Sequence, residues 1–230
     1  MLEDGLSYPM QGDSWIAQML IGGVLLVFFF LLIPVFAFNG YLLRVIGTTV
    51  EGESEPPAWD DWGELIIDGI KFSIVGLVYS IVPIVAIFGI GSVLLGLGGA
   101  AGNSGGGILA GFGFMTILLL IPVMFLVYYI VPAALANMAV EGSLGAAFDF
   151  SLLKNVVLTS DYFIAVLMPI VVGIITNIIS NILAFTVIGL VLVPFVTYYG
   201  QVAVFRMFGT AFASQTNKTA QQVTGPTTSV

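Results

Sequence analysis

The sequence predicts an all-α integral membrane protein with about five transmembrane helices. Hydrophobic residues make up 59% of its 230 residues and charged residues only 8%, whereas a soluble domain carries about 25% charged residues. The charges are also segregated, and three stretches contain no Asp, Glu, Lys or Arg: Ser14–Leu43, Phe72–Val140 and Tyr162–Phe205. A helix needs about 20 apolar residues to cross a bilayer. Because lipid offers the backbone no hydrogen bonds, such spans must be helical.

The charge-free stretches divide into five expected spans, at about residues 15–46, 72–97, 108–131, 162–183 and 185–207. The first would be one long helix kinked at Pro34, and the glycine-rich segment 98–107 would connect the second span to the third. All five would form a single transmembrane domain over residues 1–213. The polar tail 214–230 is rich in Ser, Thr and Gln and is expected to be disordered. Six spans are the alternative.

The stretch EPPAWDDWGELIIDGIKF, residues 55–72, predicts a short interfacial amphipathic helix that leads into the second span. Two prolines exclude a helix upstream, and Asp60 or Asp61 can cap the helix that follows. The acidic face would comprise Asp60, Asp61, Glu64 and Asp68. Trp59 and Trp62 would anchor the helix in the headgroup layer, and Lys71 would mark the inner membrane face. A cation site built from the same four carboxylates is the alternative. The segment 141–161 is expected to be a second amphipathic connector.

The fourth span carries a polar stripe, because Thr176, Asn177, Ser180 and Asn181 stand in two pairs four residues apart. Amides inside a membrane are costly in lipid and must face protein or water. Two interpretations follow. The stripe either holds neighbouring helices together or lines a polar cavity.

The basic residues predict the orientation of the chain. With five spans, Arg44, Lys71, Lys154 and Arg206 all fall on one side of the membrane. Basic residues concentrate on the cytoplasmic side, so the C-terminus is expected to be cytoplasmic and the N-terminus to lie outside. The localisation predicted is the cell membrane.

The composition excludes several kinds of chemistry. The chain has neither cysteine nor histidine, which removes disulfides, thiol nucleophiles, Cys/His zinc sites and histidine acid–base catalysis. No nucleophile–base pair is visible, so we expect no enzyme, no catalytic residue, no cofactor and no metal. Only five basic residues are present and the net charge is −8, so nucleic acid is not an expected partner. An acidic chain does suit a cytoplasm of very high salt.

Several segments resemble the haloarchaeal membrane family catalogued as domain of unknown function 4013: LEDGLSYP, DSWIAQMLIGG, GYLLRV, EPPAWDDWGELIIDGIK, AAFDFSLL and DYFIAV. The resemblance covers roughly residues 1–210. It implies a multi-pass inner-membrane protein of a halophilic archaeon, and it implies no activity.

The function expected is therefore a non-enzymatic, organisational or adaptor role in the membrane, with membrane lipids as partners. A homo-oligomer is compatible with this role, and the sequence does not identify a protein partner. The alternative is a transporter or channel for a small solute or ion, with a polar pathway lined by the fourth span.

Overall fold

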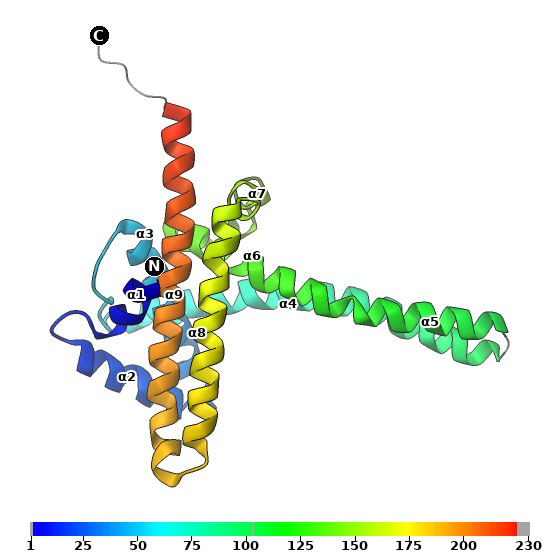
Figure 1. Cartoon of the computed structure of the whole chain (residues 1–230), viewed down its shortest axis with the longest axis horizontal. Helices are drawn as coiled ribbons and strands as arrows, with labels where there is room; N and C mark the ends of the chain where they lie inside the picture. The colour runs from blue at the N-terminus through cyan, green and yellow to red at the C-terminus, as the bar shows by residue number, and fades with distance from the viewer. Residues whose placement is uncertain (1, 103, 225–230) are drawn as a thin grey trace. The chain divides into compact units, whose positions relative to one another are not determined.

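The computed structural model describes residues 2–102 and 104–224, and all of its regular structure there is helical (Figure 1). The elements are α1 (Leu2–Ser7), η1 (Tyr8–Met10), α2 (Trp15–Val27), α3 (Leu32–Glu51), α4 (Trp62–Ala101), α5 (Ser104–Leu118), α6 (Leu120–Glu141), η2 (Leu144–Phe148), α7 (Phe150–Val157), α8 (Ser160–Ala184) and α9 (Val187–Thr224).

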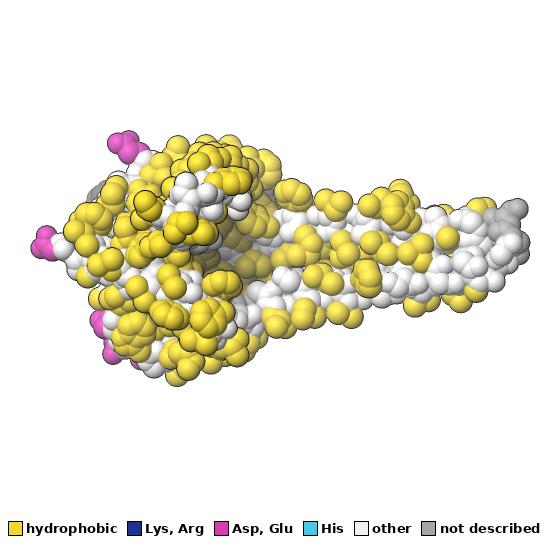
Figure 2. Space-filling view, turned by 90° about the horizontal axis from the view of Figure 1, so that it is seen from below, with side chains coloured by type: hydrophobic (Ala, Val, Ile, Leu, Met, Phe, Trp, Pro, Cys, Tyr) yellow, Lys and Arg dark blue, Asp and Glu magenta, His cyan; other side chains and the backbone are white. Residues whose placement is uncertain are grey.

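Five helical segments within the described residues are long and apolar enough to cross a membrane: Leu32–Glu51, Trp62–Ala101, Gly105–Glu141, Tyr162–Ala184 and Val187–Thr216. Figure 2 shows hydrophobic side chains over most of the face in view, with acidic side chains at its margin. The predicted class, an all-α membrane protein, is confirmed.

The chain forms two compact units. The first comprises Met1–Ser73 and Pro132–Val230, and the second is Ile74–Val131. A single transmembrane domain over residues 1–213 stays a prediction, because one membrane domain can contain more than one compact unit.

Helix α9 is the centre of the first unit and contacts α1, α2, α3, α7 and α8. Glycines allow the close approaches. A Cβ added at Gly22 or Gly23 of α2 would overlap the rings of Tyr198 and Phe195, and one added at Gly200 would overlap Thr176 of α8. The core at this junction is aromatic and includes Tyr8, Phe38, Tyr41, Trp59 and Tyr198.

Helices α3 and α4 cross within the first unit at a pair of glycines. A Cβ added at Gly40 would lie 2.7 Å from the carbonyl carbon of Leu65 and 3.0 Å from the backbone nitrogen of Gly69. A Cβ added at Gly69 would in turn lie 2.8 Å from Cα of Phe36. The two backbones are therefore in direct contact, and only glycine fits on either side.

The expected first span differs from the structure. Residues 15–46 do not form one kinked helix, because the chain leaves helical geometry after Val27 and starts again at Leu32. Pro34 is the third residue of the new helix α3. Its ring would collide with the carbonyl four residues back and it donates no backbone hydrogen bond, so it tolerates a first turn and breaks a helix interior.

A break followed by a proline in the first turn also separates α5 from α6. The chain breaks at Leu119, and Pro122 is the third residue of α6. Four other prolines lie within continuous helices: Pro83, Pro132, Pro169 and Pro194. Pro34 and Pro122 thus each lie in the first turn of a new helix, whereas Pro34 was expected to kink a continuous one.

Three further boundaries differ from expectation. Helix α4 runs without interruption from Trp62 to Ala101, so residues 62–72 are the first turns of a 40-residue helix and no separate interfacial helix precedes it. The glycine-rich segment 98–107 is mostly helical as well. Helix α9 continues to Thr224, where a disordered tail was expected from residue 214. Residues 225–230 lie outside the described residues.

The second unit is an antiparallel pair of helical segments, with α4 on one side and α5–α6 on the other. A Cβ at Gly98 would lie 2.5 Å from the backbone nitrogen of Ala110, and one at Gly113 would lie 2.7 Å from the nitrogen of Leu95. Small residues therefore bring these backbones together, as is common for helices in membranes.

Candidate functional site

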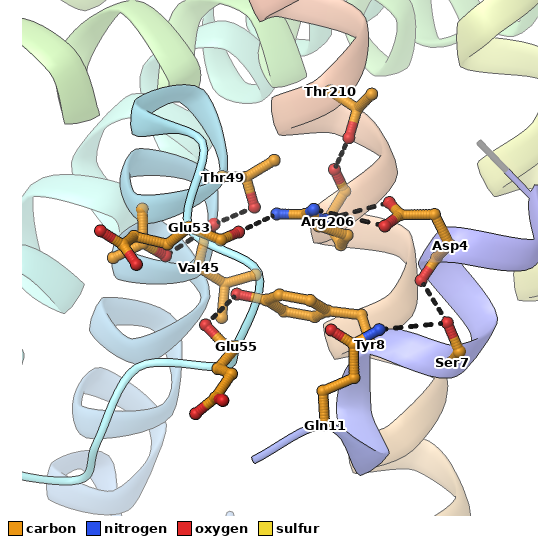
Figure 3. A network of polar contacts seen from close by, with 11 residues as sticks. Asp4, Ser7, Tyr8, Gln11, Val45, Thr49, Glu53, Glu55, Arg206 and Thr210 are labelled. Carbon is orange, nitrogen blue, oxygen red and sulfur yellow. Dashed lines mark hydrogen bonds and ion pairs between the residues drawn. The ribbon is translucent and has the colours of Figure 1, made fainter.

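A polar network surrounds Arg206 on α9 (Figure 3). Its Nε donates to Oδ2 of Asp4 at 3.1 Å, and its Nη2 donates to Oδ1 of the same carboxylate at 3.3 Å. Its Nη1 donates to the backbone carbonyl of Glu53 at 2.6 Å. The guanidinium carbon also lies 4.5 Å from the centre of the Tyr8 ring. Arginine suits this position because its planar group carries five donors and stacks on aromatic rings.

Tyr8 fixes the N-terminal segment from the other side. Its ring is fully buried, and its hydroxyl donates to the carbonyl of Glu55 at 3.1 Å. Burial raises the pKa of Tyr8 above its ordinary value. The hydroxyl of Tyr199 donates to the carbonyl of Leu6. Residues 2–10 are therefore docked against α9 and against the loop that follows α3.

This network corrects one expectation about topology. Residues 1–14 were predicted to lie across the membrane from Arg206, yet Asp4 pairs directly with Arg206. A carboxylate and a guanidinium in contact lie at the same depth. The N-terminal segment is therefore packed beside the Arg206 end of α9. Sequence reasoning missed the network, although an arginine at the end of a long apolar helix is a signal that calls for a partner.

The two tryptophans of the stretch 55–72 have different surroundings. Trp59 is 9% exposed and its ring stacks on Tyr41, with ring centres 3.9 Å apart and planes 5° from parallel. Its place in the protein core corrects the expectation that it anchors in lipid headgroups. Trp62 is 44% exposed and remains available for such a role.

The four acids of this stretch do not share one site. Asp60 accepts from Nη1 of Arg44 at 2.6 Å, and Asp68 pairs with Lys71 at 2.9 Å. Asp61 directly precedes α4 with its backbone at φ +47°, and its carbonyl accepts from the amide of Leu65. Glu64 is exposed. Over the part of the chain that is described, no three acidic side chains gather as a metal site requires. Asp60 and Asp68 are therefore held in two separate ion pairs.

An open cavity of about 250 Å³ lies beside these ion pairs, within the first unit. Its walls come from α3, the start of α4 and the end of α6. The charged lining residues are Arg44, Glu51, Asp68 and Lys71. Two cations and two acids balance in this lining, so the cavity favours neither an anion nor a cation.

The structure divides the polar stripe on α8. Thr176 packs against Gly200 of α9, and the hydroxyl oxygen of Ser180 is buried. Asn177 and Asn181 are instead exposed on the outer surface of the helix. Nδ2 of Asn181 donates to Oδ1 of Asn177 at 2.9 Å and to its backbone carbonyl at 2.8 Å. One half of the stripe therefore packs helices together, and the other half presents amides outward.

Residues 23–185 match a family described as a protein of unknown function (DUF4013). This match spans more than half of the chain. The chain belongs to the DUF4013 family. No curated protein and no solved structure matches it.

The DUF4013 match includes the glycine crossing of α3 and α4, the Arg44–Asp60 pair and the two asparagines of α8. It excludes Asp4, Tyr8 and Arg206. The family region thus contains both halves of the polar stripe, whereas the docking of the N-terminal segment depends on residues outside it.

Proposed function

We propose that this protein is a non-enzymatic, organisational component of the cytoplasmic membrane of a halophilic archaeon, and that it acts as a homodimer assembled through α8. The observation that carries the proposal is the outward position of Asn177 and Asn181 on α8, among the exposed apolar side chains of Ile174, Ile178 and Ile182. The net charge of −8 and the resemblance to haloarchaeal membrane proteins support the cellular setting.

Amides at a lipid-facing position predict a protein partner. A side-chain amide carries two donors and two acceptor positions, and the bond between Asn177 and Asn181 satisfies only some of them. Leaving the others in hydrocarbon costs free energy, and interhelical amide bonds contribute about 0.6–2 kcal/mol each. A partner helix with its own donors and acceptors at the same depth removes that cost.

A second copy of the chain is the partner that fits best. Because an amide both donates and accepts, an identical pair related by a two-fold axis is self-complementary. The neighbouring residues on this face are apolar and provide close packing around the amides. Symmetry therefore supplies the required partner without any second protein.

The same geometry argues against a polar pathway through the interior of the first unit. Such a pathway requires the stripe to face inward. Thr176 is packed on Gly200 and the two amides point away from α9. An organisational role is consequently favoured over transport of a solute or ion.

Disulfide cross-linking tests the dimer, because the chain has no native cysteine. Ile174 lies three residues before Asn177 and shares its face, whereas Ile182 lies about 100° around the helix from Asn181. Both side chains are exposed, at 53% and 63%. Oxidation in native membranes is expected to cross-link Ile174→Cys and to leave Ile182→Cys monomeric. Equal cross-linking of the two variants would indicate random collision and contradict the proposal.

The amides are tested by combining Ile174→Cys with Asn177→Leu and Asn181→Leu. Cross-linking is expected to fall at least several-fold. The matched control is the pair Ile175→Leu and Ile179→Leu, which has the same spacing on a different exposed face and should leave cross-linking unchanged. Solute or ion flux in liposomes that the two asparagine substitutions abolish would instead establish transport.

A further inference from the structure

The connection between α2 and α3 is an exposed, wholly apolar tip. Residues 28–33 read FFFLLI, and their side chains are 46%, 66%, 69%, 49%, 72% and 66% exposed. Six large apolar side chains at the end of a hairpin would be costly in water, at about 25 cal/mol for each Å² of exposed apolar surface. A tip of this composition is suited to the interior of a bilayer.

Neither arm of the hairpin has an uninterrupted apolar stretch long enough to cross, although α3 has the length of a span. Helix α2 has 13 residues and is therefore about 20 Å long, against a hydrocarbon core of about 30 Å. Helix α3 has 20 residues, but its apolar part ends at Leu43, because Arg44 pairs with Asp60. The 12 residues from Leu32 to Leu43 cover about 18 Å.

Contacts with α9 show how far the hairpin reaches. Gly5 lies against Met207, and Gly22 of α2 lies against Tyr198. From Gly22 to Val27 the helix rises at most about 8 Å further, which brings its end level with about position 193 of α9. Helix α9 itself begins at Val187. The end of α2 therefore stops short of the far end of the crossing helix.

Hydrogen bonds hold the two ends of the hairpin close together, beside Arg206 of α9. Nε2 of Gln18, near the start of α2, donates to the carbonyl of Pro56, in the loop that follows α3. Gln18 is 7% exposed, so this bond is made inside the protein. Upstream, Asp4 binds Arg206, whose Nη1 also holds the carbonyl of Glu53. The chain before α2 and the chain after α3 are thus joined to each other and to the Arg206 end of α9.

We propose that residues 15–43 form a re-entrant hairpin that enters and leaves the bilayer on the side of Arg206, with residues 28–33 in contact with lipid acyl chains in the membrane interior. The structure of the hairpin removes a difficulty of the five-span topology. The acidic segment before α2 no longer has to cross the membrane. Four complete crossings remain, formed by α4, α5–α6, α8 and α9, so both termini lie on one side.

Single cysteines and a membrane-impermeant maleimide test this topology in oriented vesicles of the full-length protein. Leu2→Cys and Ser54→Cys report the two ends of the hairpin, and Phe29→Cys reports its tip. Phe185→Cys, in the turn between α8 and α9, reports the opposite side; Phe185 is 90% exposed. All four positions lie at exposed sites, so the substitutions are expected to leave the fold intact.

The re-entrant hairpin predicts that Leu2→Cys and Ser54→Cys are labelled from one side and Phe185→Cys only from the other. Phe29→Cys should be labelled from neither side in intact vesicles and fully after solubilisation in denaturing detergent. Labelling of Phe29→Cys from the side of Phe185→Cys would show that the hairpin crosses the membrane. Labelling of Leu2→Cys and Ser54→Cys from opposite sides would show that α2 and α3 do not return to one face. Either result overturns the proposal.

Discussion

The crossing of α3 and α4 at Gly40 offers a sharp test of the packing. A Cβ at this position would lie 2.7 Å from the carbonyl carbon of Leu65 and 3.0 Å from the nitrogen of Gly69, whereas ordinary Cβ contacts are 3.4–4 Å. Both obstacles are backbone atoms, so no side chain can rotate away. Gly40→Ala therefore forces the two helices apart by roughly 1 Å, and overpacking of this kind costs about 1–3 kcal/mol.

Gly47 provides a matched control on the same face of the same helix. A Cβ there would meet the Cβ of Ala139 at 3.7 Å, which is ordinary contact. Gly47→Ala should stabilise α3 by up to about 1 kcal/mol, because alanine favours a helix more than glycine does. The expected difference in the free energy of unfolding between the two variants is therefore about 1–4 kcal/mol.

Reversible unfolding in mixed micelles, followed by circular dichroism, measures this difference. Gly40→Ala is expected to unfold at a lower denaturant concentration than the parent, and Gly47→Ala at an equal or higher one. If the two alanine variants unfolded within about 0.5 kcal/mol of each other, the backbone contact of α3 and α4 would not exist.

Three further predictions concern the charged end of the first unit. Arg206→Lys should lower the free energy of unfolding by about 1–2 kcal/mol, because the three donors of lysine lie on a single nitrogen and cannot reach both carboxylate oxygens of Asp4 and the Glu53 carbonyl as three separate guanidinium nitrogens do. Limited proteolysis should then release the N-terminal segment faster. Because burial raises the pKa of Tyr8 in the folded state, its contribution is complete below pH 10 and is lost as pH rises through the folded pKa, so Tyr8→Phe should be less sensitive to alkaline unfolding than the parent. The Ser151 hydroxyl and the Leu152 amide lower the pKa of Asp149, so its cap on α7 should act above the ordinary carboxyl pKa and weaken as pH falls through the folded value. Asp149→Ala should remove that acid-dependent step from a circular dichroism titration.

The sequence predicted those features that depend on local composition. The apolar runs identified the membrane class, and the short turn at residues 185–186 lies where the fourth and fifth spans were expected to meet. Proline chemistry was recognised but placed wrongly in the first span, because a proline that starts a helix and one that kinks it look alike in an unbroken apolar run.

Features that depend on long-range contact were not accessible from the sequence. Asp4 and Arg206 are 202 residues apart. The sequence near either residue contains no signal that predicts their pairing. Trp59 lies in a sequence segment typical of a membrane interface. Its ring nevertheless stacks on the ring of Tyr41 inside the protein core. The sequence places four polar residues at helical spacing on α8, but the register between α8 and α9 decides which of them face outward. The packing of Thr176 on Gly200 shows that register.

Self-association through α8 is tested most directly by the mass of the protein in lipid nanodiscs. The parent chain is expected to have twice the mass of one 24.4 kDa chain, and the variant carrying both Asn177→Leu and Asn181→Leu is expected to have the mass of a single chain. A parent protein with the mass of one chain, or a double variant that remains dimeric, would contradict the role assigned to the outward amides.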